Sequence, residues 1–304
     1  MTDTRDVTLQ PTPLELGSEN VRLHGAEINF GNLTGLVGNW QGANGFNMIA
    51  VPDQKGGFQL LVAPYTENLT VAAVQATTPN RGLIVIENIP TLQYSTVILD
   101  STDNSLMHVE CGFWELAGAP ARNDGFDIFR IASVPHGNAV EAMGVSSVTD
   151  GRPNIDPGLS GLPVGDLPDL NGYTDPYIFP SPGFSASSPN ETLIQYLNAQ
   201  EAKGQTVTKT VTLHVSTRNK GGLSNIASLR TNANPTQFDA TYWIETVADS
   251  STGETFQQLQ YSQRIMIEFP IQSDLSGQTI VWPHVNVNTL TLQSEATIGV
   301  QSIG

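Results

Sequence analysis

The chain of 304 residues is predicted to be an all-β protein, an antiparallel up-and-down β-barrel with one short helix and a long Pro/Gly-rich insert. Three observations support this fold class. Charged residues make up only 14% of the chain, whereas it contains 28 glycines and 19 prolines. Short apolar runs alternate with turn residues at short intervals, and only one segment has helical periodicity. All-β barrels of this length often form one domain.

The predicted strands follow one another like a meander. Residues 1–30 are expected to form an N-terminal leader with at most one short strand, and residues 293–304 a loose C-terminal tail. Glycines at 38, 42 and 45 indicate tight turns near the start of the barrel. Strand-like runs are predicted at residues 46–51, 58–64, 68–76, 83–88, 92–100, 105–116, 125–134, 138–148, 205–217, 239–248, 255–270 and 279–292.

One barrel domain is therefore expected over residues 31–292, with an insert at about 149–238. Residues 150–190 hold eight prolines and six glycines, which fits either a disordered segment or an ordered lid. The helix is predicted from Pro189 to Gly204, where Asn190 can act as the N-cap. Leu193 and Leu197 belong to its apolar stripe.

Charge and composition exclude several classes of function. Thirteen basic and 29 acidic residues give a net charge of −16, which disfavours binding to nucleic acids and to anionic membranes. No run approaches the roughly 18 apolar residues of a membrane-spanning helix, and no signal peptide is recognisable, so a cytoplasmic location is expected. Cys111 is the only cysteine, which excludes an intrachain disulfide.

Three of the five histidines stand in strand contexts that could carry chemistry. His108 shares one strand face with Glu110, His136 lies between a proline and a glycine at a kink, and His284 begins an alternating run. A lone imidazole on a strand suits haem iron, because the macrocycle supplies four other ligands. Each could instead be a hydrogen-bonded surface or turn residue. His24 and His214 lack such contexts and are expected to be structural or surface residues.

Four segments together resemble the nitrobindin family, whose members are small antiparallel β-barrels that bind haem. Their order along the chain is also the order in that family. The run MHVECGF is the most specific of the four. The segments are LVGNWQG (36–42), MHVECGF (107–113), PHGNAVE (135–141) and PHV (283–285).

The resemblance implies haem b as cofactor and assigns roles to individual residues. It makes His284 the iron ligand and His108 a pocket residue on the distal side or near the haem edge. It also implies that Trp40 and Phe113, from the same motifs, contact the cofactor. His136 departs from the family pattern, which has a small hydroxyl residue there, and is a candidate distal base. The chain is nearly twice the usual length of such a domain.

The function expected from this resemblance is a reaction of an iron–histidine site with peroxide, nitric oxide or peroxynitrite. The activity would be peroxidase-like or isomerase-like, with His136 or His108 moving a proton. Arg130 is expected to face solvent. Two alternatives remain open: a haem-free carrier for a small apolar ligand, and a non-haem metal site built from His108, Glu110 and His136. A homodimer is compatible with the sequence.

Overall fold

The computed structural model describes residues 20–23, 26–52, 58–74, 77–81, 86–117, 125–162, 164, 185–270 and 279–293. The predicted leader before residue 20, the predicted tail after residue 293 and most of the insert between residues 162 and 185 lie outside the described residues. No helix in the described part of the chain has the length and apolar character needed to span a membrane.

Ten antiparallel strands form a closed barrel, which confirms the predicted fold class. Consecutive barrel strands pair with each other along the chain, and pairing of the last strand, β15, with the first, β3, closes the circle. The barrel strands are β3 (Gly38–Pro52), β4 (Phe58–Ala73), β7 (Thr91–Asp100), β8 (Leu106–Leu116), β9 (Ile128–Val134), β10 (Asn138–Asp150), β11 (Gln205–Ser216), β13 (Asn234–Asp249), β14 (Thr255–Pro270) and β15 (Thr279–Leu292).

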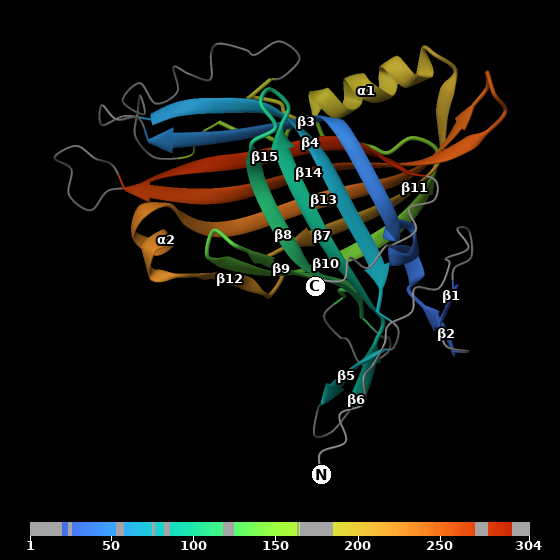
Figure 1. Ribbon diagram of the computed structural model, residues 1–304, viewed down its shortest axis with the longest axis horizontal. Coiled ribbons are helices and arrows are strands. Elements are labelled where there is room, and N and C mark those ends of the chain that lie inside the picture. The colour runs from blue at the N-terminus through green and yellow to red at the C-terminus, as the bar shows by residue number, and fades with distance from the viewer. Residues whose placement is uncertain are drawn as a thin grey trace, which may run out of the picture.

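Smaller elements decorate this barrel. The hairpin of β1 (Asn20–Leu23) and β2 (Ala26–Asn29) precedes it, and the hairpin of β5 (Thr78–Arg81) and β6 (Ile86–Ile89) projects away from it (Figure 1). A 3-10 helix, η1 (Gly31–Leu36), leads into β3. The remaining elements are α1 (Glu191–Glu201), β12 (Gly222–Asn225) and α2 (Ala227–Asn232).

One long strand, β4, replaces two predicted strands at residues 58–64 and 68–76. The first of these predicted strands ended at Pro64, and proline cannot donate a ladder hydrogen bond. In the structure, the pairing of β4 with β7 begins at Tyr65, opposite Asp100, so residues before Tyr65 pair with β3 alone. Proline is tolerated at such an edge, and the strand continues through it.

The predicted insert contributes to both the wall and the cover of the barrel. β11 falls inside the predicted range 149–238 and is one of the ten barrel strands. α1 lies on the outside of the barrel (Figure 1), where the apolar stripe of Leu193 and Leu197 is fully buried. These leucines belong to an apolar cluster with Trp243 of β13 and Val285 of β15. The insert therefore adds a second apolar cluster: its part beneath α1 lies outside the barrel wall, whereas its member Ile267 faces the cavity.

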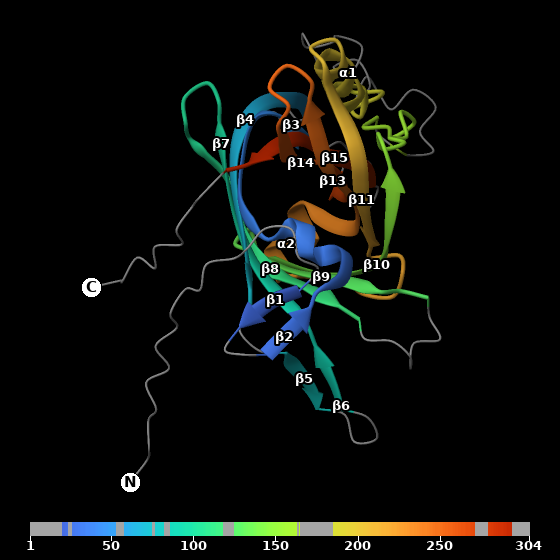
Figure 2. The same ribbon diagram turned by 90° about the vertical axis from the view of Figure 1, so that its right-hand side faces the viewer.

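The two ends of the barrel are filled differently. At one end, Leu33 and Leu36 of η1 are buried in the main apolar core together with Trp40 of β3 and Trp114 of β8. At the other end, the chain leaves β11, pairs briefly with β10 through β12 and forms α2. Figure 2 looks along the barrel with α2 behind the opening. The packed end leaves little free space, whereas the α2 end encloses a cavity.

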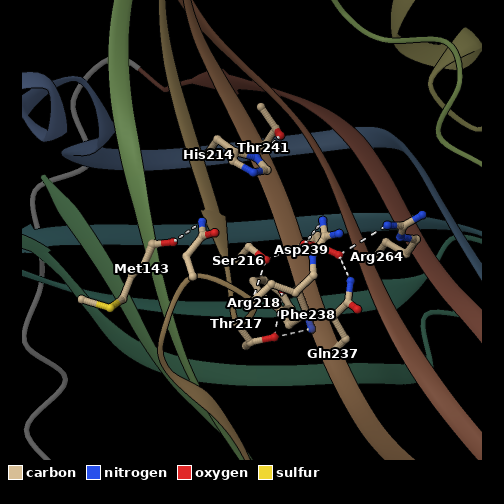
Figure 3. A network of polar contacts seen from close by, with 11 residues as sticks. Met143, His214, Ser216, Thr217, Arg218, Gln237, Phe238, Asp239, Thr241 and Arg264 are labelled. Carbon is tan, nitrogen blue, oxygen red and sulfur yellow. Dashed lines mark hydrogen bonds and ion pairs between the residues drawn. The ribbon is translucent and has the colours of Figure 1, made fainter. Parts of the chain in front are cut away.

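A polar network fixes the turn that carries β12 and α2 to that end. Asp239 of β13 accepts hydrogen bonds from Ser216 (2.6 Å) and Arg218 (2.9 Å), and Arg264 of β14 lies 3.4 Å from its other oxygen. Figure 3 shows these side chains gathered around Asp239. Burial alone would raise the pKa of Asp239, but the hydrogen bonds from Ser216, Gln237 and Arg218 outweigh it and lower that pKa.

Beneath α1 lies a buried carboxyl group that makes stability depend on pH. Glu245 is fully buried, and it accepts a hydrogen bond from Gln258 (2.6 Å), which in turn accepts one from Gln200 of α1 (2.7 Å). Burial raises the pKa of Glu245 from 4.5 to about 8, more than Gln258 and Arg152 lower it. The folded protein therefore holds a proton that the unfolded chain releases at lower pH.

Replacing Glu245 with glutamine is expected to remove this pH dependence. Because unfolding releases the proton between pH 4.5 and about 8, wild-type stability should fall as pH rises, by roughly 3 kcal/mol between pH 4.5 and pH 7. Urea unfolding at several pH values should show a flatter profile for Glu245→Gln than for the wild type. The exposed Glu254→Gln is the control and should keep the wild-type slope. Equal slopes in all three proteins would contradict a neutral Glu245.

Candidate functional site

A cavity of about 380 Å³ occupies the α2 end of the barrel interior. Its size falls in the range of small-molecule sites, and like them it has mostly apolar walls with a few polar groups. The polar groups are Asn47, Tyr65, His108, Glu110, His136, Asn138, Gln263, His284 and Asn286. The apolar walls are Ile49, Ile98, Met107, Val134, Val140, Leu229, Ala233, Pro235, Phe238, Ile265 and Ile267.

The three singled-out histidines all line this cavity, although they are far apart in the sequence. His108 comes from β8, His136 from the turn between β9 and β10, and His284 from β15. Strand alternation explains the placement on β8, since His108 and Glu110 share the inward face. On β15, His284 lies opposite Ile265 of β14, which also faces the cavity.

His284 is held as a neutral imidazole. Burial, together with the nearby His108 and His136, lowers the pKa of His284 to about 3. Its Nε2 atom is 2.6 Å from Oδ1 of Asn47 on β3. Pro283 lies within β15, which begins at Thr279 as predicted. The proline is tolerated because β3 pairs with β15 only from Val285 onward, so no residue of β3 needs a hydrogen-bond donor at Pro283.

His108 and His136 form a pair at the side of the cavity. Their ring centroids are 5.5 Å apart, with the planes tilted by 48°. Nε2 of His108 lies 3.4 Å from Oε2 of Glu110. The side chain of His136 is largely exposed to solvent. The part of it that is buried, together with the nearby His108, lowers its pKa. His136 is therefore neutral near pH 7 and can accept a proton.

Arg130 does not face solvent, so the prediction for this residue was wrong. It is 4% exposed and forms an ion pair with Glu110 inside the barrel. Its guanidinium carbon lies 4.9 Å from the ring centre of Phe238 and 5.4 Å from that of Tyr94. Burial alone would raise the pKa of Glu110, but Arg130 outweighs it and lowers that pKa to about 2. A charge that strand alternation turns inward needs such a partner.

Trp40 and Phe113, which were predicted to contact the cofactor, do not line this cavity. Trp40 is fully buried in the packed core at the other end of the barrel, where its Nε1 donates to the carbonyl of Leu36 (2.8 Å). Phe113 is 39% exposed. It is an odd number of residues from His108 on the same strand, so the two side chains leave opposite faces of the sheet.

The alternative of a non-haem metal site is also corrected. Within the described ranges, no three His, Cys, Asp or Glu side chains are arranged to hold a metal ion. His108, Glu110 and His136 do line one cavity, but Glu110 is engaged by Arg130 and by the hydroxyl of Tyr94. Both of these partners bind Oε1, and the ion pair with Arg130 already balances the charge of this carboxylate, which makes it a poor metal ligand.

Sequence reasoning missed a polar cluster beside the cavity. Glu67 of β4 is buried, and it accepts hydrogen bonds from Tyr261 (2.7 Å), Asn288 (2.8 Å) and Thr96 (2.9 Å). Tyr65, which lines the cavity, meets Tyr261 with 2.8 Å between their hydroxyl oxygens. Alternation along β4 places residues 65 and 67 on the same face, but no sequence signal identified that face as the interior.

The residues at the cavity fit a haem iron in donor chemistry. The neutral imidazole of His284 is the protonation state that binds iron, and apolar side chains supply walls for a macrocycle. Oδ1 of Asn286, on the same strand face as His284, is buried without a hydrogen-bond partner within the described structure. The hydrogen bond between His284 and Asn47 must open before Nε2 can bind a metal.

Fold and site together define the chain as a closed antiparallel β-barrel with an internal cavity of ligand size. No family model and no curated protein sequence matches the chain. Among solved structures, the fold is similar to that of Rv2717c from M. tuberculosis, with 16% sequence identity and a TM-score of 0.42. That similarity covers 86% of this chain and 95% of the other. At this level of identity and TM-score, the similarity supports no functional argument.

Proposed function

We propose that this protein binds haem b in the barrel cavity, with His284 as the iron ligand. The observation that carries the proposal is the convergence of His108, His136 and His284 on one cavity with mostly apolar walls. Their motifs were singled out together in the sequence, and only folding brings them together. Haem bound through one histidine would supply an iron site whose other face can meet peroxide, nitric oxide or peroxynitrite.

The side chains around this site divide the remaining work. His284 on β15 would hold the iron, and the apolar side chains of the cavity would limit access of water. His136 can take a proton from an incoming peroxide and return it to the oxygen that leaves as water. His108 lies close to His136 and to the Glu110 carboxylate, so it can orient the His136 ring and share the proton. The chain as proposed is therefore a peroxidase-like or isomerase-like enzyme.

Replacing His136 with alanine is expected to reduce peroxide turnover of the haemin-loaded protein by about 100-fold, the usual contribution of a general base. Stopped-flow decay of peroxide measures the effect, while the haemin absorption spectrum should stay unchanged. The same substitution at His214, a half-buried residue of β11 whose Nδ1 lies 3.0 Å from the hydroxyl of Thr241, is the control. Unchanged turnover in His136→Ala would remove the role of base from this residue.

A haem-free carrier of a small apolar ligand is the second candidate, and one observation favours it. Nε2 of His284 already has a good partner in Asn47, so the cavity is satisfied without a metal at that atom. The absorption spectrum separates the two functions. Purified protein that takes up haemin and shows a Soret band shifted by cyanide or nitric oxide supports the haem protein. Protein that takes up no haemin but binds a fluorescent fatty acid supports the carrier.

A further inference from the structure

Four tyrosines of the described residues lie buried together inside the barrel. Tyr65 lines the ligand cavity, whereas Tyr94, Tyr242 and Tyr261 surround a smaller space of about 30 Å³ beside it. This space is large enough for one water molecule. Trp114 also lines it. Buried tyrosines commonly stabilise a core through packing, but here their phenol groups also meet carboxylates, and this chemistry has no part in the function proposed above.

The aromatic rings form an unbroken column that starts at the cavity wall. The hydroxyls of Tyr65 and Tyr261 are 2.8 Å apart. The ring of Tyr261 stacks on Tyr242, with centroids 5.4 Å apart and planes at 29°. Tyr242 meets Trp114 edge-on, with centroids 5.2 Å apart. Each step is in direct contact, so an electron vacancy can pass along the column.

The charges at the two ends of this column differ and decide where a vacancy settles. The guanidinium of Arg130 lies 5.7 Å from the ring centre of Tyr242 and 5.9 Å from that of Trp114, so it opposes a positive charge at that end. The hydroxyl of Tyr261 instead donates a hydrogen bond to the carboxylate of Glu67, with 2.7 Å between the two oxygens. Burial raises the pKa of Glu67, more than its hydrogen bonds lower it. Glu67 is therefore the better base for a phenol proton.

Tyr94 offers an internal comparison. Its hydroxyl also donates to a buried carboxylate, that of Glu110. Glu110, however, is ion-paired with Arg130, and its pKa is lowered to about 2. A carboxylate with so low a pKa takes up a proton poorly. Of these two phenol–carboxylate pairs, only Tyr261 with Glu67 is suited to proton loss during oxidation.

We infer that Tyr65 and Tyr261 form a redox-active pair, in which oxidation in the cavity leaves a tyrosyl radical on Tyr261 and transfers its phenolic proton to Glu67. Removal of one electron breaks the O–H bond of Tyr261: the electron passes through Tyr65 to the oxidant, and the proton moves to the carboxylate. Reduction of one hydrogen peroxide to two waters takes up two electrons and two protons. Tyr261 gives one electron, and its proton stays on Glu67. Tyr65 gives the other electron together with its proton, and the second proton comes from solvent at the cavity. As a peroxide-driven reaction, this inference rests on the proposed function.

The radical can be tested without haem. A photogenerated ruthenium(III) tris-bipyridine complex serves as the one-electron oxidant for the haem-free full chain, and transient absorption and EPR identify the radical. All variants carry phenylalanine at the three other tyrosines, Tyr173, Tyr177 and Tyr196, so that only the four buried tyrosines can respond. Tyr261→Phe and Glu67→Gln are compared with Tyr94→Phe, and circular dichroism confirms that each is folded.

We expect a tyrosyl radical in the parent and in Tyr94→Phe, and its loss in Tyr261→Phe. In Glu67→Gln the radical should form about 100-fold more slowly, because the base is missing. An unchanged radical in Tyr261→Phe, or an equal loss in Tyr94→Phe, would overturn the assignment. If Tyr261→Phe does not fold, unchanged kinetics in Glu67→Gln overturns it as well. Failure of the chain to bind haemin would refute the proposed function and leave this radical assay unaffected.

Discussion

Replacing His284 with alanine is expected to abolish tight haemin binding and to raise the dissociation constant at least about 100-fold. Loss of partners that merely support a metal ligand costs about 10- to 100-fold in affinity, and His284 is proposed as the ligand itself. Titration of the purified protein with haemin, followed by its Soret absorption, measures the effect. The side chain lies inside a preformed cavity, so its removal enlarges that space and leaves the strand pairing of β15 in place.

The matched control is His214→Ala. Like His284, His214 is a strand histidine with one neutral hydrogen-bond partner, but its neighbours Leu213 and Val215 face the core, so it lies on the outer face of the barrel. Haemin affinity should be unchanged in this variant. Equal affinities of the wild type and His284→Ala would refute His284 as the ligand. Absence of haemin binding in the wild type would refute the haem function as a whole.

Replacing Arg130 with alanine is expected to destabilise the fold by about 3–5 kcal/mol, the usual cost of breaking a buried ion pair. The substitution leaves the carboxylate of Glu110 without its cation in the barrel interior, and it removes the guanidinium from among Tyr94, Trp114, Phe238 and Tyr242. Equilibrium unfolding in urea, monitored by tryptophan fluorescence, measures the change.

Two further variants test whether the expected loss of stability comes from burial of the ion pair. Arg152 forms an ion pair with Glu201 that is partly exposed, so Arg152→Ala should cost about 1 kcal/mol or less. The double variant Glu110→Gln/Arg130→Met removes both charges and should recover part of the stability lost in Arg130→Ala. A loss in Arg130→Ala no larger than that in Arg152→Ala would contradict a buried, structural Arg130.

Individual residues show where sequence reasoning succeeded. Alternation on β8 placed His108 and Glu110 on one face, and that face is the interior. The same rule, applied to Phe113, would have placed it on the outer surface, but motif resemblance was followed instead. Arg130 was assigned to solvent because a single strand pattern cannot tell an inward charge from an outward one. Its partner Glu110 comes from the neighbouring strand β8, and this pairing is not encoded within β9.

Local sequence by itself determined the strand-rich fold class, the helix at α1 and the three histidine motifs, because periodicity and turn residues act over a few neighbouring positions. Asn190, the predicted N-cap of α1, makes no capping hydrogen bond and instead donates to the carbonyl of Asp156. Tertiary structure alone decided that β11 completes the wall, that α2 covers the cavity, and that Tyr65, Glu67 and Tyr261 meet in the interior. These contacts depend on closure of the barrel, which fixes register and inward direction for all ten strands together. No single segment contains that information.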